Sequence, residues 1–106
     1  MNLRGTDANA ALAIDRAARS LVNWGLWDEA QAYLERALAI REDVLGERDF
    51  DTSTSLLKLA VRFQLTGRGG QARRLLERAL AVRADICGDT HPATEIVREN
   101  LRLTEG

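Results

Sequence analysis

Apolar residues recur along the chain at the three-to-four-residue spacing of amphipathic helices. In the first segment, about residues 7–24, one face carries Ile14, Ala17, Ala18 and Leu21. The same spacing predicts further helices at about 28–45, 52–66, 71–87 and 93–103. No stretch keeps the alternation of apolar and polar residues that is typical of a strand. The predicted fold class is therefore all-α.

Residues that end or begin helices stand at the predicted boundaries. Thr6 or Asp7 is expected to cap the first helix, and Asp51 or Thr52 the third, because their side-chain oxygens can accept backbone N–H groups. Pro92 suits the first position of the fifth helix. Glycine, which adopts the left-handed conformation readily, follows each of the first four helices, at positions 25, 46, 67 and 88.

One stretch of the chain occurs twice. Residues 34–46 reappear as residues 76–88, an offset of 42, and nine of the thirteen positions are identical. A fixed period of this size is the signature of repeat proteins, in which each helix pair buries its apolar face against a neighbour. The offset predicts two helix-turn-helix repeats followed by a terminal capping helix.

Composition narrows the class of protein. A chain of 106 residues is long enough for a single domain with a modest core. Charged residues make up 29% and the net charge is −1, which argues against nucleic acid or an anionic membrane as partner. No run of 18 apolar residues occurs, and the N-terminus lacks the apolar core of a signal peptide, so we predict a cytoplasmic location.

Residues that could carry out chemistry are few. His91 is the only histidine and Cys87 the only cysteine, so we predict no catalytic triad, no metal site and no cofactor. Cys87 stands one period after Leu45 and is expected to be a buried, inert thiol; His91 is expected in a loop or as a cap. The Gly67–Gly70 segment follows a helix and lacks the Gly-Lys-Ser/Thr ending of a phosphate loop, so it indicates a turn.

Two surface features each have two interpretations. Trp24 and Trp27 are expected to pack the first inter-helix turn, the alternative being an exposed tryptophan that joins two chains. Arg73, Arg74 and Arg78 are expected to form a solvated helix face, the alternative being a contact with an acidic partner or RNA.

Small and apolar residues recur at matching places in the helix pairs. They are Leu59, Ala60, Phe63 and Gly67 in one first helix and turn, and Ala30, Leu34, Ala37, Ala72, Leu76 and Ala79 in the two second helices. In this spacing the chain, from about residue 9 to 101, resembles the tetratricopeptide repeat, whose usual period is about 34 residues. The runs at 35–41 and 88–94 resemble in particular the longer form, of about 42 residues, found in kinesin light chains and many bacterial signalling proteins.

The chain departs from the repeat pattern in two places. Gly69 and Gly70 stand where Trp27 and Asp28 stand one period earlier, which predicts a weaker start for the fourth helix. In the last helix Arg98 and other polar residues replace apolar ones, as expected for a helix that ends a stack.

The resemblance implies a stack whose first helices line a concave groove that binds a peptide or protein segment. The groove residues that it implies are Asp15, Arg19, Val22 and Asn23 in the first helix and Leu57, Val61, Gln64 and Leu65 in the third. The apolar members of the third helix have a second interpretation, as packing between neighbouring first helices. The carboxylate clamp of some family members is not expected, because the groove positions carry Asp15, Leu57 and Ile96 instead of its basic and amide residues.

These observations favour a non-enzymatic protein-interaction module, within a larger bacterial signalling or regulatory protein, that binds a protein or peptide but no nucleic acid or membrane. Self-association is the alternative, because three or more repeats are normally needed for a stable stack and two leave apolar ends uncovered. A third hypothesis, a regulatory fragment of an ATPase or protease, has no nucleotide-binding motif in its favour.

Overall fold

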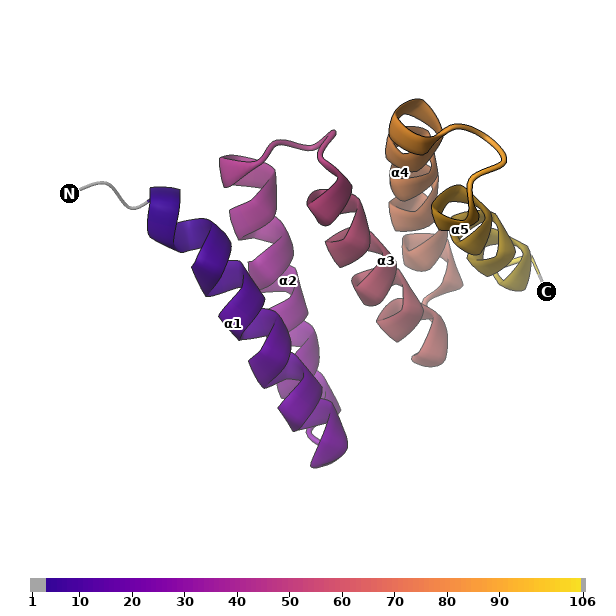
Figure 1. The fold of residues 1–106 in the computed structure, drawn as a ribbon. Helices are drawn as coiled ribbons and strands as arrows, with labels where there is room; N and C mark the ends of the chain where they lie inside the picture. Colours follow the sequence, from indigo (N-terminus) through magenta and orange to yellow (C-terminus); the bar gives the residue numbers. More distant parts are fainter. Residues whose placement is uncertain (1–3, 106) are drawn as a thin grey trace. The chain divides into compact units, whose positions relative to one another are not determined.

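The computed structural model describes residues 4–105, with side chains from residue 8 onward. Five helices and no strand occur in this range (Figure 1), which confirms the all-α class and the order of two helical hairpins and a terminal helix. The helices are α1 (Arg4–Asn23), α2 (Trp27–Val44), α3 (Phe50–Leu65), α4 (Gly69–Cys87) and α5 (Pro92–Leu103). The chain divides into two compact units, Met1–Glu47 with α1 and α2, and Arg48–Gly106 with α3 to α5.

Every helix begins one to three residues before its predicted start. Helix α1 begins at Arg4, so the prediction of a cap at Thr6 or Asp7 is wrong. The cap of α3 is Asp49, whose carboxylate accepts a hydrogen bond from the backbone N–H of Asp51 at 2.8 Å. The prediction of Asp51 or Thr52 is wrong because Asp49, the nearest upstream acid, can take the same role and adds a half-turn to the helix.

The left-handed glycines are the most regular feature of the chain. Gly25, Gly46, Gly67 and Gly88 all have positive φ, each 21 residues after the last. In the second hairpin the N–H of Arg68 donates to the carbonyl of Phe63 at 2.7 Å, and Leu26 bonds to Leu21 in the same way in the first hairpin at 2.8 Å. This bond across five residues satisfies a carbonyl that the helix end would leave unpaired, and it requires the left-handed residue.

We expect Gly67→Ala to lower the free energy of unfolding by about 1 kcal/mol, because φ of 78° at this position is strained for any residue with a Cβ. Urea denaturation followed by circular dichroism measures the change. Gly70→Ala is the matched control: Gly70 is helical with open space around its Cβ position, so this change should stabilise the chain by about 0.5 kcal/mol. Equal effects of the two substitutions would contradict the assignment.

The two units have cores of different size. In the first, α1 packs on α2 through small side chains, and the fully or almost fully buried residues are Ala11, Ala18, Ala30 and Ala37. In the second, α4 packs on both α3 and α5 through larger side chains, among them Leu56, Leu59, Phe63, Leu76 and Val97. Alanine contacts bring two helices close together, whereas leucine and phenylalanine bury more apolar area per residue.

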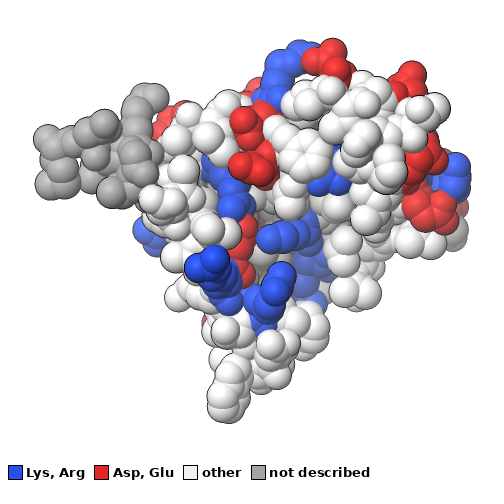
Figure 2. All heavy atoms as spheres, viewed as in Figure 1, with Lys and Arg blue, Asp and Glu red and all other residues white. Residues whose placement is uncertain are grey.

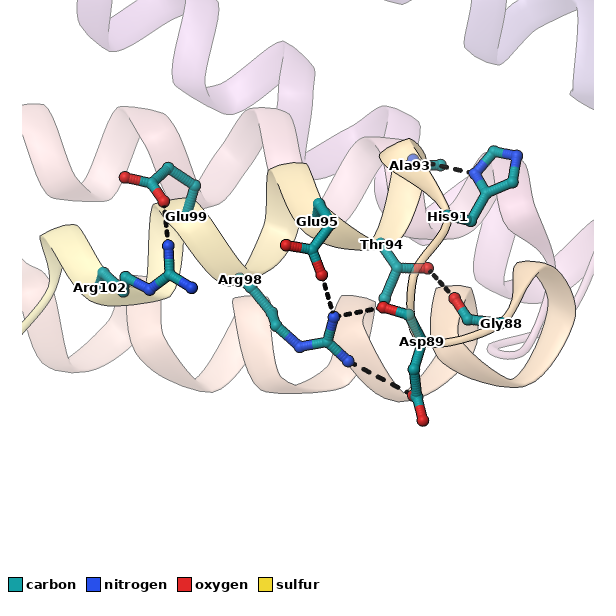
Figure 3. Close-up of polar contacts among 9 residues, drawn as sticks. All are labelled: Gly88, Asp89, His91, Ala93, Thr94, Glu95, Arg98, Glu99 and Arg102. Atoms are coloured by element: carbon teal, nitrogen blue, oxygen red, sulfur yellow. Dashed lines mark hydrogen bonds and ion pairs between the residues drawn. The ribbon is translucent and has the colours of Figure 1, made fainter.

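The loop before α5 and the first turns of that helix are held by polar contacts (Figure 3). The ring nitrogen Nδ1 of His91 accepts a hydrogen bond from the N–H of Ala93 at 3.0 Å, which confirms the predicted capping role. The hydroxyl of Thr94 donates to the carbonyl of Gly88 at 2.8 Å. Arg98 contacts both the backbone carbonyl of Asp89 and the carboxylate of Glu95. Arg98, the polar residue expected on the terminal helix, therefore holds the preceding loop against α5. Figure 2 shows acidic and basic side chains next to one another in the α5 region.

Candidate functional site

A buried ion pair joins the two helices of the first unit. The guanidinium of Arg41 on α2 lies 2.6 Å from the carboxylate of Asp15 on α1, and the two side chains are only 10% and 7% exposed. The placement of Asp15 in an exposed groove is therefore wrong. Its carboxylate is turned toward α2, where it compensates the charge of the buried arginine.

Arg83 on α4 is buried at the corresponding place of the second unit. Its guanidinium donates to the hydroxyls of Ser53 at 2.9 Å and Thr54 at 3.0 Å, and to the carbonyl of Ala93 at 3.0 Å. It also lies over the ring of Phe50, 4.6 Å from its centroid. Burial lowers the pKa of Arg83 from its ordinary value, because desolvation disfavours the charged form. Arg83 thus connects α4 to the starts of both α3 and α5.

Sequence reasoning missed the role of these two arginines. Arg41 and Arg83 are identical at an offset of 42, in the stretch that occurs twice, and each falls on the same helix face as a buried alanine four residues earlier, Ala37 or Ala79. A charged residue repeated on the inner face of a helix is the signal that could have found them.

The expected groove residues of α1 divide by exposure. Arg19 and Asn23 are exposed, and Val22 is half-buried. Asp15 is removed from this set by its ion pair. Among the expected groove residues of α1, one cation and one amide are thus exposed, and Leu12 is 45% exposed on the same helix.

The expected groove residues of α3 also differ from one another. Leu65 is 70% exposed and Val61 38% exposed, while Leu57 and Gln64 are half-buried. The packing interpretation concerns a contact of α3 with the first helix of the other unit and stays a prediction. The outward side of α3 is an apolar strip of Leu57, Val61 and Leu65, with the amide of Gln64 next to its last residue.

The end of the first hairpin is more exposed than predicted. The side chain of Trp24 is 82% exposed and that of Trp27 42% exposed, so the interpretation that both pack the turn is wrong for Trp24. The turn is closed by backbone hydrogen bonds, such as the one from Leu26 to Leu21, and does not need the indole of Trp24.

Each unit has a shallow hollow that is lined by both helices of its hairpin. The hollow of the first unit has a volume of about 210 Å³ and is lined by Ile14, Tyr33 and Arg36. The hollow of the second unit, of about 190 Å³, is lined by Phe63, Gln71, Arg74 and Leu75. Both combine apolar walls with an arginine, a surface suited to a side chain of a partner and too small for a large cofactor.

Groups for covalent or metal chemistry are scarce in the described part of the chain. No three His, Cys, Asp or Glu side chains come together there to hold a metal ion. Cys87 is half-buried, so the expectation of a buried thiol is wrong. Within residues 4–105, no helix is both long and apolar enough to cross a bilayer.

Comparison with protein families places most of the chain in a known family. Residues 7–85, well over half of the chain, match the family described as tetratricopeptide repeat. A search of the curated proteins finds no match.

Proposed function

The chain belongs to the tetratricopeptide repeat family, a family of protein-interaction modules, and from this premise we propose that it binds a peptide or protein segment on the outward faces of its first helices. The residues proposed to contact the partner are Arg19, Val22 and Asn23 on α1 and Leu57, Val61, Gln64 and Leu65 on α3. We propose further that it acts without catalysis, as repeats of this family typically do.

The exposure of these side chains is the observation that supports the proposal. Val61 and Leu65 leave apolar area exposed to water. Exposed apolar area is unfavourable in free energy, and a partner that covers it removes this cost. Arg19 and Asn23 add donors that can orient a peptide backbone or an acidic side chain.

The proposal extends to the kind of repeat and its setting. Glycines with positive φ recur at an offset of 42, from Gly25 to Gly67 and from Gly46 to Gly88, which supports the long repeat form of kinesin light chains. A regulatory role within a bacterial signalling protein is part of the same proposal and rests on the resemblance alone.

Peptide selection from a displayed library tests the proposal. Arg19→Glu and Val61→Glu should each weaken the binding of recovered peptides about tenfold or more, measured by fluorescence anisotropy. Arg78→Glu and Ala81→Glu, both on α4, are matched controls, because they make the same charge changes at exposed positions of a second helix. If every recovered peptide binds all four variants as it binds the unmodified chain, the assigned surface is wrong.

Self-association is the second candidate function, and the exposed Trp24 favours it. An indole that is 82% exposed on a chain with few aromatic residues is a strong candidate for contact with another molecule.

A further inference from the structure

The end of the first hairpin presents an apolar and acidic surface, which we call the Trp end. Its residues are Trp24, Leu26, Trp27, Asp28 and Glu29. Trp24, Leu26 and Trp27 are 82%, 46% and 42% exposed. Asp28 and Glu29 lie exposed in the first turn of α2, and neither forms an ion pair with any residue in the described range 4–105. Apolar area and uncompensated negative charge thus stand side by side.

The end of the second hairpin presents a hollowed, basic surface, which we call the Arg end. Its residues are Phe63, Arg68, Gln71, Arg74 and Leu75, four of which line the hollow of about 190 Å³. The guanidinium of Arg68 lies over the ring of Phe63, 5.9 Å from the centroid.

Arg68 and Arg74 differ from their basic neighbours because neither meets a carboxylate of the described chain. The adjacent Arg73, by contrast, pairs with Glu77 at 3.2 Å. The Arg end therefore combines an apolar hollow with two guanidinium groups whose charge is not compensated locally.

The two ends occupy the same place in the repeat, but their chemistry is opposite. At an offset of 42, Leu26 corresponds to Arg68 and Trp24 to Thr66. Asp28 and Glu29 correspond to the uncharged Gly70 and Gln71. The first end is thus apolar with negative charge, and the second carries positive charge beside its hollow. Such a difference between two copies of one motif is what a contact between unlike surfaces requires.

We propose that the Trp end of one copy of this chain docks on the Arg end of a second copy. The indole of Trp24 enters the hollow beside Phe63 and Leu75, and its face meets a guanidinium, since tryptophan is the best partner in cation–π contacts. Asp28 and Glu29 pair with Arg68 and Arg74, whose forked donors match carboxylate geometry. The second copy thereby supplies the charges that each end lacks.

Because the two surfaces differ, each docked pair retains one unused end of each kind. Association therefore continues head to tail, into an open chain or a closed ring of copies. This inference deepens the self-association alternative and does not depend on the peptide-binding surface of α1 and α3.

Sedimentation velocity across a wide concentration range tests the proposal. The average mass of the unmodified chain should rise with concentration above that of the monomer, and added salt should reduce it. Trp24→Ala should weaken association at least about tenfold. Ile86→Ala is the matched control, because Ile86 is 52% exposed near the opposite end of α4. A strict monomer at high micromolar concentration, or equal association of the Trp24→Ala variant, would overturn the proposal.

A mixing experiment separates a contact between unlike ends from one in which the same end of two copies meets. Trp24→Ala leaves the Arg end intact, and the double variant Arg68→Glu/Arg74→Glu leaves the Trp end intact. Each variant alone should be monomeric, and an equimolar mixture should form a discrete 1:1 heterodimer. A mixture that stays monomeric overturns the proposal, provided that circular dichroism shows both variants folded, as expected for substitutions at exposed positions. Peptide selection on the Trp24→Ala variant tests the peptide-binding surface separately, so that failure of one proposal is distinguishable from failure of the other.

Discussion

Replacement of Asp15 by leucine is expected to lower the free energy of unfolding by about 3 kcal/mol, because it leaves the guanidinium of Arg41 buried without its carboxylate. Leucine is the residue that the second repeat carries at this position, as Leu57. The substitution therefore introduces a side chain that the fold already accepts one period later. Urea denaturation followed by circular dichroism measures the change.

The double variant Asp15→Leu/Arg41→Met is the decisive control. Replacing a buried ion pair by apolar side chains of similar volume is often neutral or stabilising, so the double variant should regain most of the stability that the single variant loses. If the double variant is as unstable as Asp15→Leu alone, the loss arises from packing and the ion pair is not its cause.

The helical part of the fold was predictable because it depends on local spacing. Apolar residues at helical intervals and a glycine after each of the first four helices placed every helix within three residues of its observed ends. The starts were less predictable, because several nearby residues can cap a helix. At α3, Asp49, Asp51 and Thr52 are all good caps, and only the path of the preceding loop decides among them.

The exposure of particular side chains was less predictable than the helices. Asp15 and Arg19 lie four residues apart on α1, yet the first is buried and the second exposed. What separates them is the partner across the hairpin: Arg41 reaches Asp15, and this depends on packing between helices that helical spacing does not specify. Trp24 is the opposite case. Its size predicts burial, but it follows the last residue of α1, where the turn gives it nothing to pack against.

The two repeats differ in the acceptors of their buried arginines, a difference that the sequence repeat does not show. Arg41 and Arg83 are identical residues at equivalent places, yet their partners differ. Ser53 and Thr54 supply hydroxyls to Arg83, whereas the corresponding residues one period earlier are Ala11 and Leu12. The first repeat lacks those acceptors and provides a carboxylate at position 15 instead. A buried arginine is thus kept in both copies with two different sets of acceptors.

Arg83→Ala is expected to lower the free energy of unfolding by about 3 kcal/mol, because the charged guanidinium makes three hydrogen bonds in a buried site. The contact of the guanidinium with Phe50 is lost as well. The bond to the carbonyl of Ala93 ties the start of α5 to α4, so amide hydrogen exchange in the first turns of α5 should become faster than in α3. Urea denaturation and hydrogen exchange followed by mass spectrometry measure the two effects.

Two further substitutions separate hydrogen bonding from bulk and charge. Arg83→Met keeps much of the side-chain volume, and Arg83→Lys keeps the charge but not the planar fork that reaches three acceptors. Both should therefore remain clearly less stable than the unmodified chain, whereas Arg74→Ala, at an exposed position of the same helix, should change stability by no more than about 0.5 kcal/mol. Full stability of the lysine variant would show that charge alone suffices at this site. The geometry argues otherwise, because Ser53, Thr54 and Ala93 surround the guanidinium from two different helix starts, and a single ammonium group cannot reach all three along the directions that the guanidinium uses.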